Sequence, residues 1–319
     1  MDILGLDIGK SRFDACLMSQ KAKQTISLPN NQAGFDQLAA WLARHRPDAT
    51  QPLHACMEAT GNYGLDLAAF LFAEGATVSI VNPRQIHAFG QAELARNKTD
   101  QLDCALIARF CAAFNPPPWT PPLAHMRHLR ELTRRCAALK ATRTQELNRQ
   151  KAGAVCPAVH ASIQRHLALL NCEIELIAGE IRAVLATDSQ LQSNFDLLRT
   201  IPGIGEVTSA LLLAELPNIT EFKPKALAAF AGLSPAEHSS GQRQQGGGIS
   251  RIGNAMLRSA LYLSALAAAR HNPRLKDFLA RMNEAKKPKK VILVAVARKL
   301  LVMAQAVLKT QTPFSAQPG

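Results

Sequence analysis

The sequence predicts an α/β domain that is followed by a mostly α-helical remainder. Short apolar segments alternate with helical patterns over the first 115 residues, which is typical of a sheet covered by helices. A Pro-rich segment comes next, and beyond it apolar residues recur at three- and four-residue steps. We therefore expect a first domain over residues 1–115, a linker and helical arm over 116–190, and a helical domain over 191–319.

Charge and apolar patterning narrow the class of partner. The formal net charge of +13 over 319 residues favours a polyanion, either nucleic acid or an anionic membrane surface. The start is acidic with a short apolar run, so we expect no signal peptide, and no apolar stretch of membrane-spanning length is expected. The seven cysteines are scattered without a C-x-x-C pair, which predicts reduced thiols in a cytoplasmic protein.

The first ten residues predict a buried strand in which Asp7 takes the place of an apolar residue. A buried carboxylate is costly unless it is hydrogen-bonded, paired or bound to a metal. Glu58 repeats this pattern at the end of another apolar strand, before a Gly-containing loop. The other expected elements are strands at Phe13–Met18, Gln24–Leu28, Leu53–Met57 and Thr77–Val81, the first two antiparallel to their neighbours, and helices at residues 31–44, Leu65–Ala73 and 99–114.

Asp100 and Asp103 are three residues apart and therefore share one face of the helix that begins near Thr99. Each carboxylate also has a structural interpretation, as a hydrogen-bonded aspartate or as an acid that favours a helix N-terminus. If Asp7, Glu58 and this pair converge, each unneutralised pair at about 4 Å costs roughly 4 kcal/mol at an effective dielectric of 20. Such a cluster would need cations, and an all-oxygen ligand set selects Mg²⁺ or Mn²⁺.

The helical arm is expected as two long helices, His125–Lys151 and Ala158–Leu185, which pack as a hairpin or coiled coil. The first helix is rich in arginine, including Arg130 and Arg134, with few balancing acids. This face either contacts nucleic acid or is simply solvated.

A Pro-Gly-Ile-Gly turn between helices resembles a helix-hairpin-helix DNA-binding element. The amides near Gly203 and Gly205 precede a helix N-terminus, where they could bind phosphate oxygens, although a purely structural turn is the alternative. Farther along, a Gly-rich loop contains Ser239, Ser240 and Gly241, and is either a flexible loop or a nucleophile loop. Helices are then expected at Asn254–Ala269, Arg274–Asn283 and Val291–Leu308, with a disordered tail after Thr310.

Three motifs together resemble those of the DEDD-type insertion-sequence transposases. They are Gly5-Leu6-Asp7-Ile8-Gly9-Lys10, Met57-Glu58-Ala59-Thr60-Gly61 and Asn97-Lys98-Thr99-Asp100-Gln101-Leu102-Asp103. The resemblance implies an N-terminal domain similar to RuvC-type Holliday-junction resolvases, with a ribonuclease-H-like fold. It also implies that Asp7, Glu58, Asp100 and Asp103 hold Mg²⁺ against DNA phosphates, and that the arm is a coiled coil with a part in multimer contacts.

The same family carries a Gly-Leu-x-Pro and Ser-Gly pattern in its C-terminal domain. Gly232-Leu233-Ser234-Pro235 and Ser240-Gly241 match this pattern. The resemblance implies that Ser240 forms a covalent phosphoserine with DNA, with Ser239 as the alternative. The stretch after Gly241 departs from the family because it is rich in Gln and Gly rather than strongly basic.

We therefore expect a transposase and DNA recombinase that acts on donor and target DNA. The resemblance further implies guidance by a structured (bridge) RNA, and a homo-oligomer, dimer or tetramer, in the nucleoid-associated cytoplasm. Two other functions are consistent with the residues: a metal-dependent nuclease or junction resolvase that uses water, and a non-enzymatic nucleic-acid-binding protein. The candidate nucleic-acid contacts are Lys10, Lys98, Arg130, Arg134, Gly203, Gly205 and Arg251.

Overall fold

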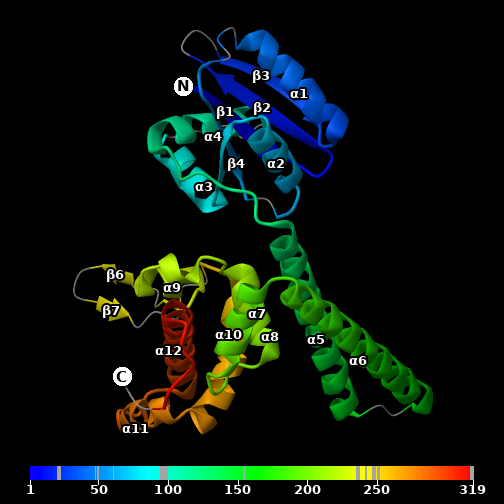
Figure 1. The fold of residues 1–319 in the computed structure, drawn as a ribbon, viewed down its shortest axis with the longest axis vertical. Helices are drawn as coiled ribbons and strands as arrows, with labels where there is room; N and C mark the ends of the chain where they lie inside the picture. The colour runs from blue at the N-terminus through cyan, green and yellow to red at the C-terminus, as the bar shows by residue number, and fades with distance from the viewer. Residues whose placement is uncertain are drawn as a thin grey trace. The chain divides into compact units, whose positions relative to one another are not determined.

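A computed structural model describes the chain as two compact units, Met1–Pro122 and Leu123–Gly319, each with its own core (Figure 1). The described residues are 1–19, 23–46, 48, 50–59, 61–93, 100–153, 156–234, 238–240, 243–245, 249 and 252–316. For residues 100–102, 238–240 and 243–245 the description covers the backbone alone. The predicted division into three parts stays a prediction.

The N-terminal unit is built on a five-stranded mixed sheet with the strand order β3-β2-β1-β4-β5. The first three strands form an antiparallel meander, whereas β1, β4 and β5 run parallel. The predicted strands are confirmed to within a residue or two, and the arrangement is consistent with the ribonuclease-H-like fold that the resemblance implies. The strands are β1 Asp2–Ile8, β2 Arg12–Met18, β3 Lys23–Pro29, β4 Leu53–Glu58 and β5 Thr77–Val81.

Side chains alternate across this sheet, and each face has its own helices. Leu4, Leu6 and Ile8 of β1 enter the core formed with α1 (Gln32–His45) and α2 (Leu65–Ala73). The opposite face, which includes Ile3, packs against α3 (Pro83–Ala92) and α4 (Asp100–Phe114). The helix α1 begins where the sequence predicts, because the side chain of its N-cap Asn31 accepts a hydrogen bond from the Gly34 amide.

The helix α3 was not predicted from the sequence. This helix starts at Pro83, a residue that suits the first helical turn, and the Asn82 side chain caps it by accepting a hydrogen bond from the Arg84 amide at 3.0 Å. The Asn-Pro pair reads equally well as a turn, so the start signal was present but ambiguous.

The Pro-rich segment after α4 packs against β5 within the same unit. The Trp119 amide donates to the Val78 carbonyl at 2.6 Å, and the Ser79 hydroxyl donates to the carbonyls of Pro116 and Pro117 at 3.0 and 2.9 Å. His54 Nε2 lies 2.8 Å from Ser79 Oγ, and both side chains are buried. The segment thus covers the edge strand of the sheet.

The C-terminal unit is almost entirely helical. The hairpin of α5 (Ala124–Ala152) and α6 (Pro157–Ala186) confirms the predicted pair of long helices (Figure 1). Its remaining elements are α7 Ser189–Arg199, α8 Glu206–Glu215, the 3₁₀ turns Ile219–Glu221 and Pro273–Leu275, α9 Pro224–Phe230, α10 Ala255–His271, α11 Lys276–Glu284 and α12 Lys289–Thr310. A two-stranded hairpin, β6 His238–Ser240 and β7 Arg243–Gln245, lies in the segment that we expected to be a loop.

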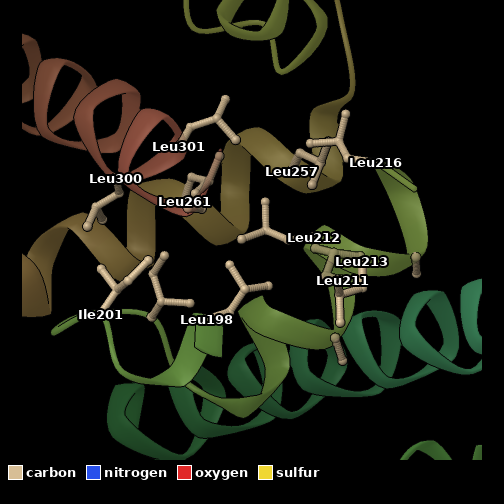
Figure 2. Close-up of a cluster of buried hydrophobic side chains, with 14 of the residues drawn as sticks. Leu198, Ile201, Leu211, Leu212, Leu213, Leu216, Leu257, Leu261, Leu300 and Leu301 are labelled. Carbon is tan, nitrogen blue, oxygen red and sulfur yellow. The ribbon is translucent and has the colours of Figure 1, made fainter. Parts of the chain in front are cut away.

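Leucines from four helices meet at the centre of this unit. Leu198 of α7, Leu212 of α8, Leu261 of α10 and Leu300 of α12 point toward one another and are almost fully buried (Figure 2). They belong to one continuous cluster that also reaches the ends of α5 and α6. The base of the helical hairpin is therefore fixed to the helical body by apolar packing.

Two expectations are wrong for the C-terminal part of the chain. We expected no apolar stretch of membrane-spanning length, but α12 is long and apolar enough to cross a membrane, because its only internal charges are Arg298 and Lys299. Half of the relevant window is buried inside the unit, which is the pattern of a core helix. The tail after Thr310 is ordered through residue 316: the Phe314 amide donates to Thr200 Oγ1 at 2.9 Å, and Arg274 lies 5.4 Å from the Phe314 ring centroid.

Candidate active site

Asp7 and Glu58 lie at the same edge of the sheet, and their side chains are on the same face. Leu6 and Met57 are register partners in the parallel ladder of β1 and β4, and the two acids follow them directly. Leu6 and Met57 point into the α1/α2 core, so the alternation of strand side chains directs Asp7 and Glu58 to the α3/α4 face. Both acids are half-buried at the carboxyl ends of their strands.

The helix α4 lies directly against β1 on that face. A Cβ atom added to Gly5 would collide with the Cys104 carbonyl and the Ala108 backbone of α4. Gly5 precedes Asp7 by two residues, and the half-buried Asp103 precedes Cys104 by one. The helix that carries Asp103 therefore packs on the strand that carries Asp7, which is possible only because Gly5 lacks a side chain.

Two cysteine pairs join α4 to the sheet beside the carboxylates. Cys16 and Cys56 flank Gly5 on β2 and β4, and they hydrogen-bond Cys104 and Cys111 of α4. The hydrogen bond with Cys16 and burial raise the pKa of Cys104, and the negative charges of Cys16, Asp14 and Asp7 add to the shift. The pKa of Cys56 is raised likewise by its Cys111 partner, by burial and by the charge of Glu58.

The fourth carboxylate of the predicted set, Asp100, is at the first residue of α4, and its side chain lies outside the described structure. Among the described residues, no group of three or more His, Cys, Asp or Glu side chains could hold a metal ion. The structure places Asp7, Glu58 and Asp103 on the same side of the sheet but does not bring these three described carboxylates together as a metal site. The complete four-carboxylate site, which also needs Asp100, stays a prediction.

Ser239 and Ser240 lie on β6 of the small hairpin. Their backbones pair with Gln244 and Arg243 of β7, and Ser240 is the last residue of β6. The side chains of both serines lie outside the described structure, as do Gly241, Lys98 and Arg251. Their predicted roles therefore stay predictions.

The segment that carries the hairpin leaves and re-enters the helical body at one point. Gly232 and Gly253, both with positive φ, approach so closely that a Cβ at Gly253 would meet the Gly232 amide and the Phe230 carbonyl. The Asn254 amide donates to the Phe230 carbonyl at 2.7 Å, and the Asn254 side chain caps α10. The ends of the segment are thus fixed to each other.

Glu215 anchors this crossing to the helical arm. Its carboxylate is 2% exposed and accepts hydrogen bonds from Asn254 Nδ2 at 2.9 Å and from both Nε and Nη2 of Arg134. Arg130 Nε lies 3.7 Å from the same carboxylate. Arg130 and Arg134 thus have an internal partner, which we did not foresee, while their predicted contacts with nucleic acid stay predictions.

The Pro-Gly-Ile-Gly turn connects α7 to α8 and packs against α10. Gly203 adopts φ +102°, and a Cβ there would overlap Ala268 of α10. Asn272 Nδ2 donates to the Pro202 carbonyl at 3.2 Å. The need for glycine at position 203 is therefore explained by packing. Gly205 is exposed at the N-cap of α8. In the N-terminal unit, Lys10 is exposed after β1, and the predicted contacts of all three residues with nucleic acid stay predictions.

Comparison with known proteins decides the family. A DEDD transposase model of IS110 elements matches residues 4–153, and one described as "Transposase IS116/IS110/IS902 family" matches residues 195–280. The pilin gene-inverting protein of Moraxella bovis is 35% identical over 316 residues, covering 98% of this chain and 97% of that protein. The chain belongs to the IS110-type DEDD transposase family. As a member, it is a transposase/recombinase enzyme that acts on DNA.

Other relatives of this transposase are also named as transposases of insertion sequences. The transposase of the Yersinia enterocolitica insertion sequence IS1328 is 26% identical, over 98% of each chain. The transposase of IS1111A from Coxiella burnetii is 38% identical over 93 residues, 29% of this chain and 24% of the relative. A Thermus thermophilus RuvC structure covers 37% of this chain and 99% of its own, with 14% identity and a TM-score of 0.27, too low to add to the assignment.

Two residues that were not singled out from the sequence support the candidate residues of this transposase, Gly5 in the N-terminal unit and Glu215 in the C-terminal unit. Gly5 sets the approach of α4, and its only signal was its place two residues before Asp7. Glu215 is the last residue of the apolar helix α8, and it connects this helix to α5 and to the start of α10. An acid that ends an apolar helix was a signal of the kind that identified Glu58.

Proposed function

We propose that Asp7, Glu58, Asp100 and Asp103 hold a divalent cation, Mg²⁺ or Mn²⁺, at the carboxyl edge of the sheet. The observation that carries this proposal is the register of β1 and β4, which brings Asp7 and Glu58 side by side on the α4 face. Carboxylate oxygens alone suit a hard cation. When bound, such an ion would polarise a DNA phosphate and offset its charge.

Ser240 is the nucleophile in this proposal. Its Oγ attacks the phosphorus of one DNA strand, the bond between phosphorus and the 3′-oxygen breaks, and the leaving oxygen takes a proton as a 3′-hydroxyl. The serine proton passes to a base or to solvent. The resulting 5′-phosphoserine keeps a phosphodiester bond, so a second 3′-hydroxyl can attack it, rejoin the DNA and release Ser240.

The carboxylates and Ser240 belong to different compact units. In this proposal the carboxylates of one subunit act together with Ser240 of another, in a homo-oligomer that is a dimer or tetramer. The relative named for pilin gene inversion extends the proposal to site-specific inversion as well as transposition. The net charge of +13 supports a polyanion as partner, here DNA and a guide RNA. Because the substrate is DNA, the proposed place of action is the nucleoid-associated cytoplasm.

Covalent trapping tests this function. A plasmid carrying the DNA that flanks the gene in its genome, with the RNA transcribed from those flanks, is incubated with the full-length protein and Mg²⁺. After denaturation, labelled DNA should remain attached to the wild type and to Ser239→Ala, but not to Ser240→Ala. The adduct should also disappear in Asp7→Asn or in chelator.

A metal-dependent nuclease that uses water is the outcome that would overturn the serine step. It predicts strand cleavage by wild type and by Ser240→Ala alike, with no adduct. An adduct that forms equally well in Asp7→Asn would instead remove the carboxylates from the chemistry.

A further inference from the structure

A cavity of about 730 Å³ lies between α10 and α12 in the C-terminal unit. This volume falls within the range of roughly 300–1,000 Å³ that is common for ligand sites. Its walls are mainly apolar, with Val291, Val294 and Ala295 on α12 and the aromatic ring of Tyr262 on α10. The cavity can therefore take a flat, largely apolar group.

Three cations also line this cavity: Arg258 on α10, and Lys290 and Arg298 on α12. No Asp or Glu is among the described lining residues. Arg258 Nη1 is buried and, within the described chain, has no hydrogen-bond partner. The guanidinium of Arg258 is therefore a partly buried charge without a paired acid among the described lining residues, and an anionic group in the cavity would offset it.

The cavity borders the segment that carries Ser240. Leu233 at the start of that segment and Ile249 after β7 both line it. The Arg258 guanidinium lies against Gly232, so close that a Cβ at Gly232 would overlap Nη1. The cavity therefore lies where the segment that carries Ser240 joins the helical body.

We propose that the cavity binds one unpaired nucleotide of the DNA strand next to the phosphate that Ser240 attacks. The base stacks on Tyr262 between apolar walls, and the phosphate accepts hydrogen bonds from Arg258, Lys290 and Arg298. The location beside a scissile phosphate rests on the proposed function, whereas the nucleotide chemistry rests on the cavity itself. Apolar walls alone would suit a helix of a second copy, but three cations without an acid favour a polyanion.

The test uses the full-length protein and a single-stranded oligothymidylate with one central 2-aminopurine. Stacking on Tyr262 should quench 2-aminopurine fluorescence on binding. Tyr262→Ala should lose the quench and weaken binding by roughly 5- to 150-fold, the range expected for one base–aromatic stack. Tyr262→Phe keeps the ring and should bind like wild type.

A second pair of variants guards against misfolding of Tyr262→Ala. Ser259 is exposed and lines the cavity, so Ser259→Trp should fill it and remove the quench. Leu263 on the same helix is 63% exposed and does not line the cavity, so Leu263→Trp is the matched control. Unchanged quenching and affinity in both Ser259→Trp and Tyr262→Ala would overturn the proposal. A changed sedimentation mass in these variants, with DNA binding intact, would also overturn it and assign the cavity to a subunit contact.

Ser240→Ala separates this inference from the proposed function. It should bind and quench the probe like wild type even though it forms no covalent adduct. Loss of the serine step with retained Tyr262 dependence would leave the nucleotide site standing, and the reverse result would remove only the nucleotide site.

Discussion

Arg134 donates two parallel hydrogen bonds to the carboxylate of Glu215, from Nε to Oε1 at 2.7 Å and from Nη2 to Oε2 at 3.1 Å. This fork connects the helical arm to the last residue of α8, and Asn254 ties the same carboxylate to the start of α10. The hydrogen bond with Glu215 raises the pKa of Arg134 further above its ordinary value, so the guanidinium stays charged. The start of the arm is therefore coupled to the base of the serine hairpin.

The first prediction compares two neighbouring arginines on α5. Arg134→Gln should lower the free energy of unfolding by about 2–3 kcal/mol, because a buried carboxylate loses its main partner. Arg135 is exposed, so Arg135→Gln should change it by less than about 0.5 kcal/mol. Chemical denaturation without DNA measures both. Equal stabilities would show that the fork is not structurally important.

The second prediction concerns the packing of α4 on the sheet. Gly5→Ala should destabilise the N-terminal unit by about 2–3 kcal/mol, because the new methyl meets the α4 backbone. Gly90→Ala, on α3, meets only the end of the Leu106 side chain and should cost much less. Both tryptophans, Trp41 and Trp119, lie in this unit, so their fluorescence reports its unfolding. A stable Gly5→Ala variant would contradict the close approach.

The third prediction separates catalysis from stability at the carboxylates. Asp7→Asn and Glu58→Gln should abolish DNA strand cleavage, because each removes a charge that a cation needs. In chelator the same variants should unfold within about 1 kcal/mol of wild type, since the amide has nearly the size and shape of the carboxylate that it replaces. Asp36→Asn, on the exposed surface of α1, is the control and should cleave normally. Large destabilisation by Asp7→Asn would assign it a structural role instead.

The fourth prediction is a pH dependence that arises from His54. Burial lowers the pKa of His54 below its ordinary value of 6.5. As pH falls below about 6.5 the unfolded chain takes up the proton first, so the stability present above that pH is progressively lost. The tryptophan-monitored melting temperature should therefore fall between pH 7 and pH 5.

Two histidine variants check the source of that dependence. His54→Gln cannot ionise and should flatten the pH profile of the melting temperature. The exposed His87, also in the N-terminal unit, should leave the profile unchanged when replaced by Gln. An unaltered slope in His54→Gln would place the titration elsewhere.

Local signals were sufficient for most helices and strands. The helix expected from Asn30 or Asn31 begins at the N-cap Asn31, and the helix expected over Asn254–Ala269 begins directly after its N-cap Asn254. The β6–β7 hairpin was missed because its strands are three residues long and polar, so no periodic pattern could form. The tail was misjudged because its order depends on Thr200 and Arg274, which are distant in sequence.

The site shows the same division between local and distant information. Asp7 and Glu58 were recognised because each is an acid in an apolar strand, which is visible within ten residues. The partner of Arg134 is 81 residues away, so a basic helix face looked free for nucleic acid when one of its charges is bound internally. Such pairings depend on tertiary packing and cannot be read from charge composition alone.

The crossing of Gly232 and Gly253 has an evolutionary consequence. Because the chain returns to its point of departure, the length and composition of the excursion between them can change while the helices on either side keep their places. Closing a longer loop costs little, about 0.6 kcal/mol for each doubling of its length. Related transposases could therefore vary the segment between Gly232 and Gly253, and with it their contacts with DNA, while the surrounding helices stay the same.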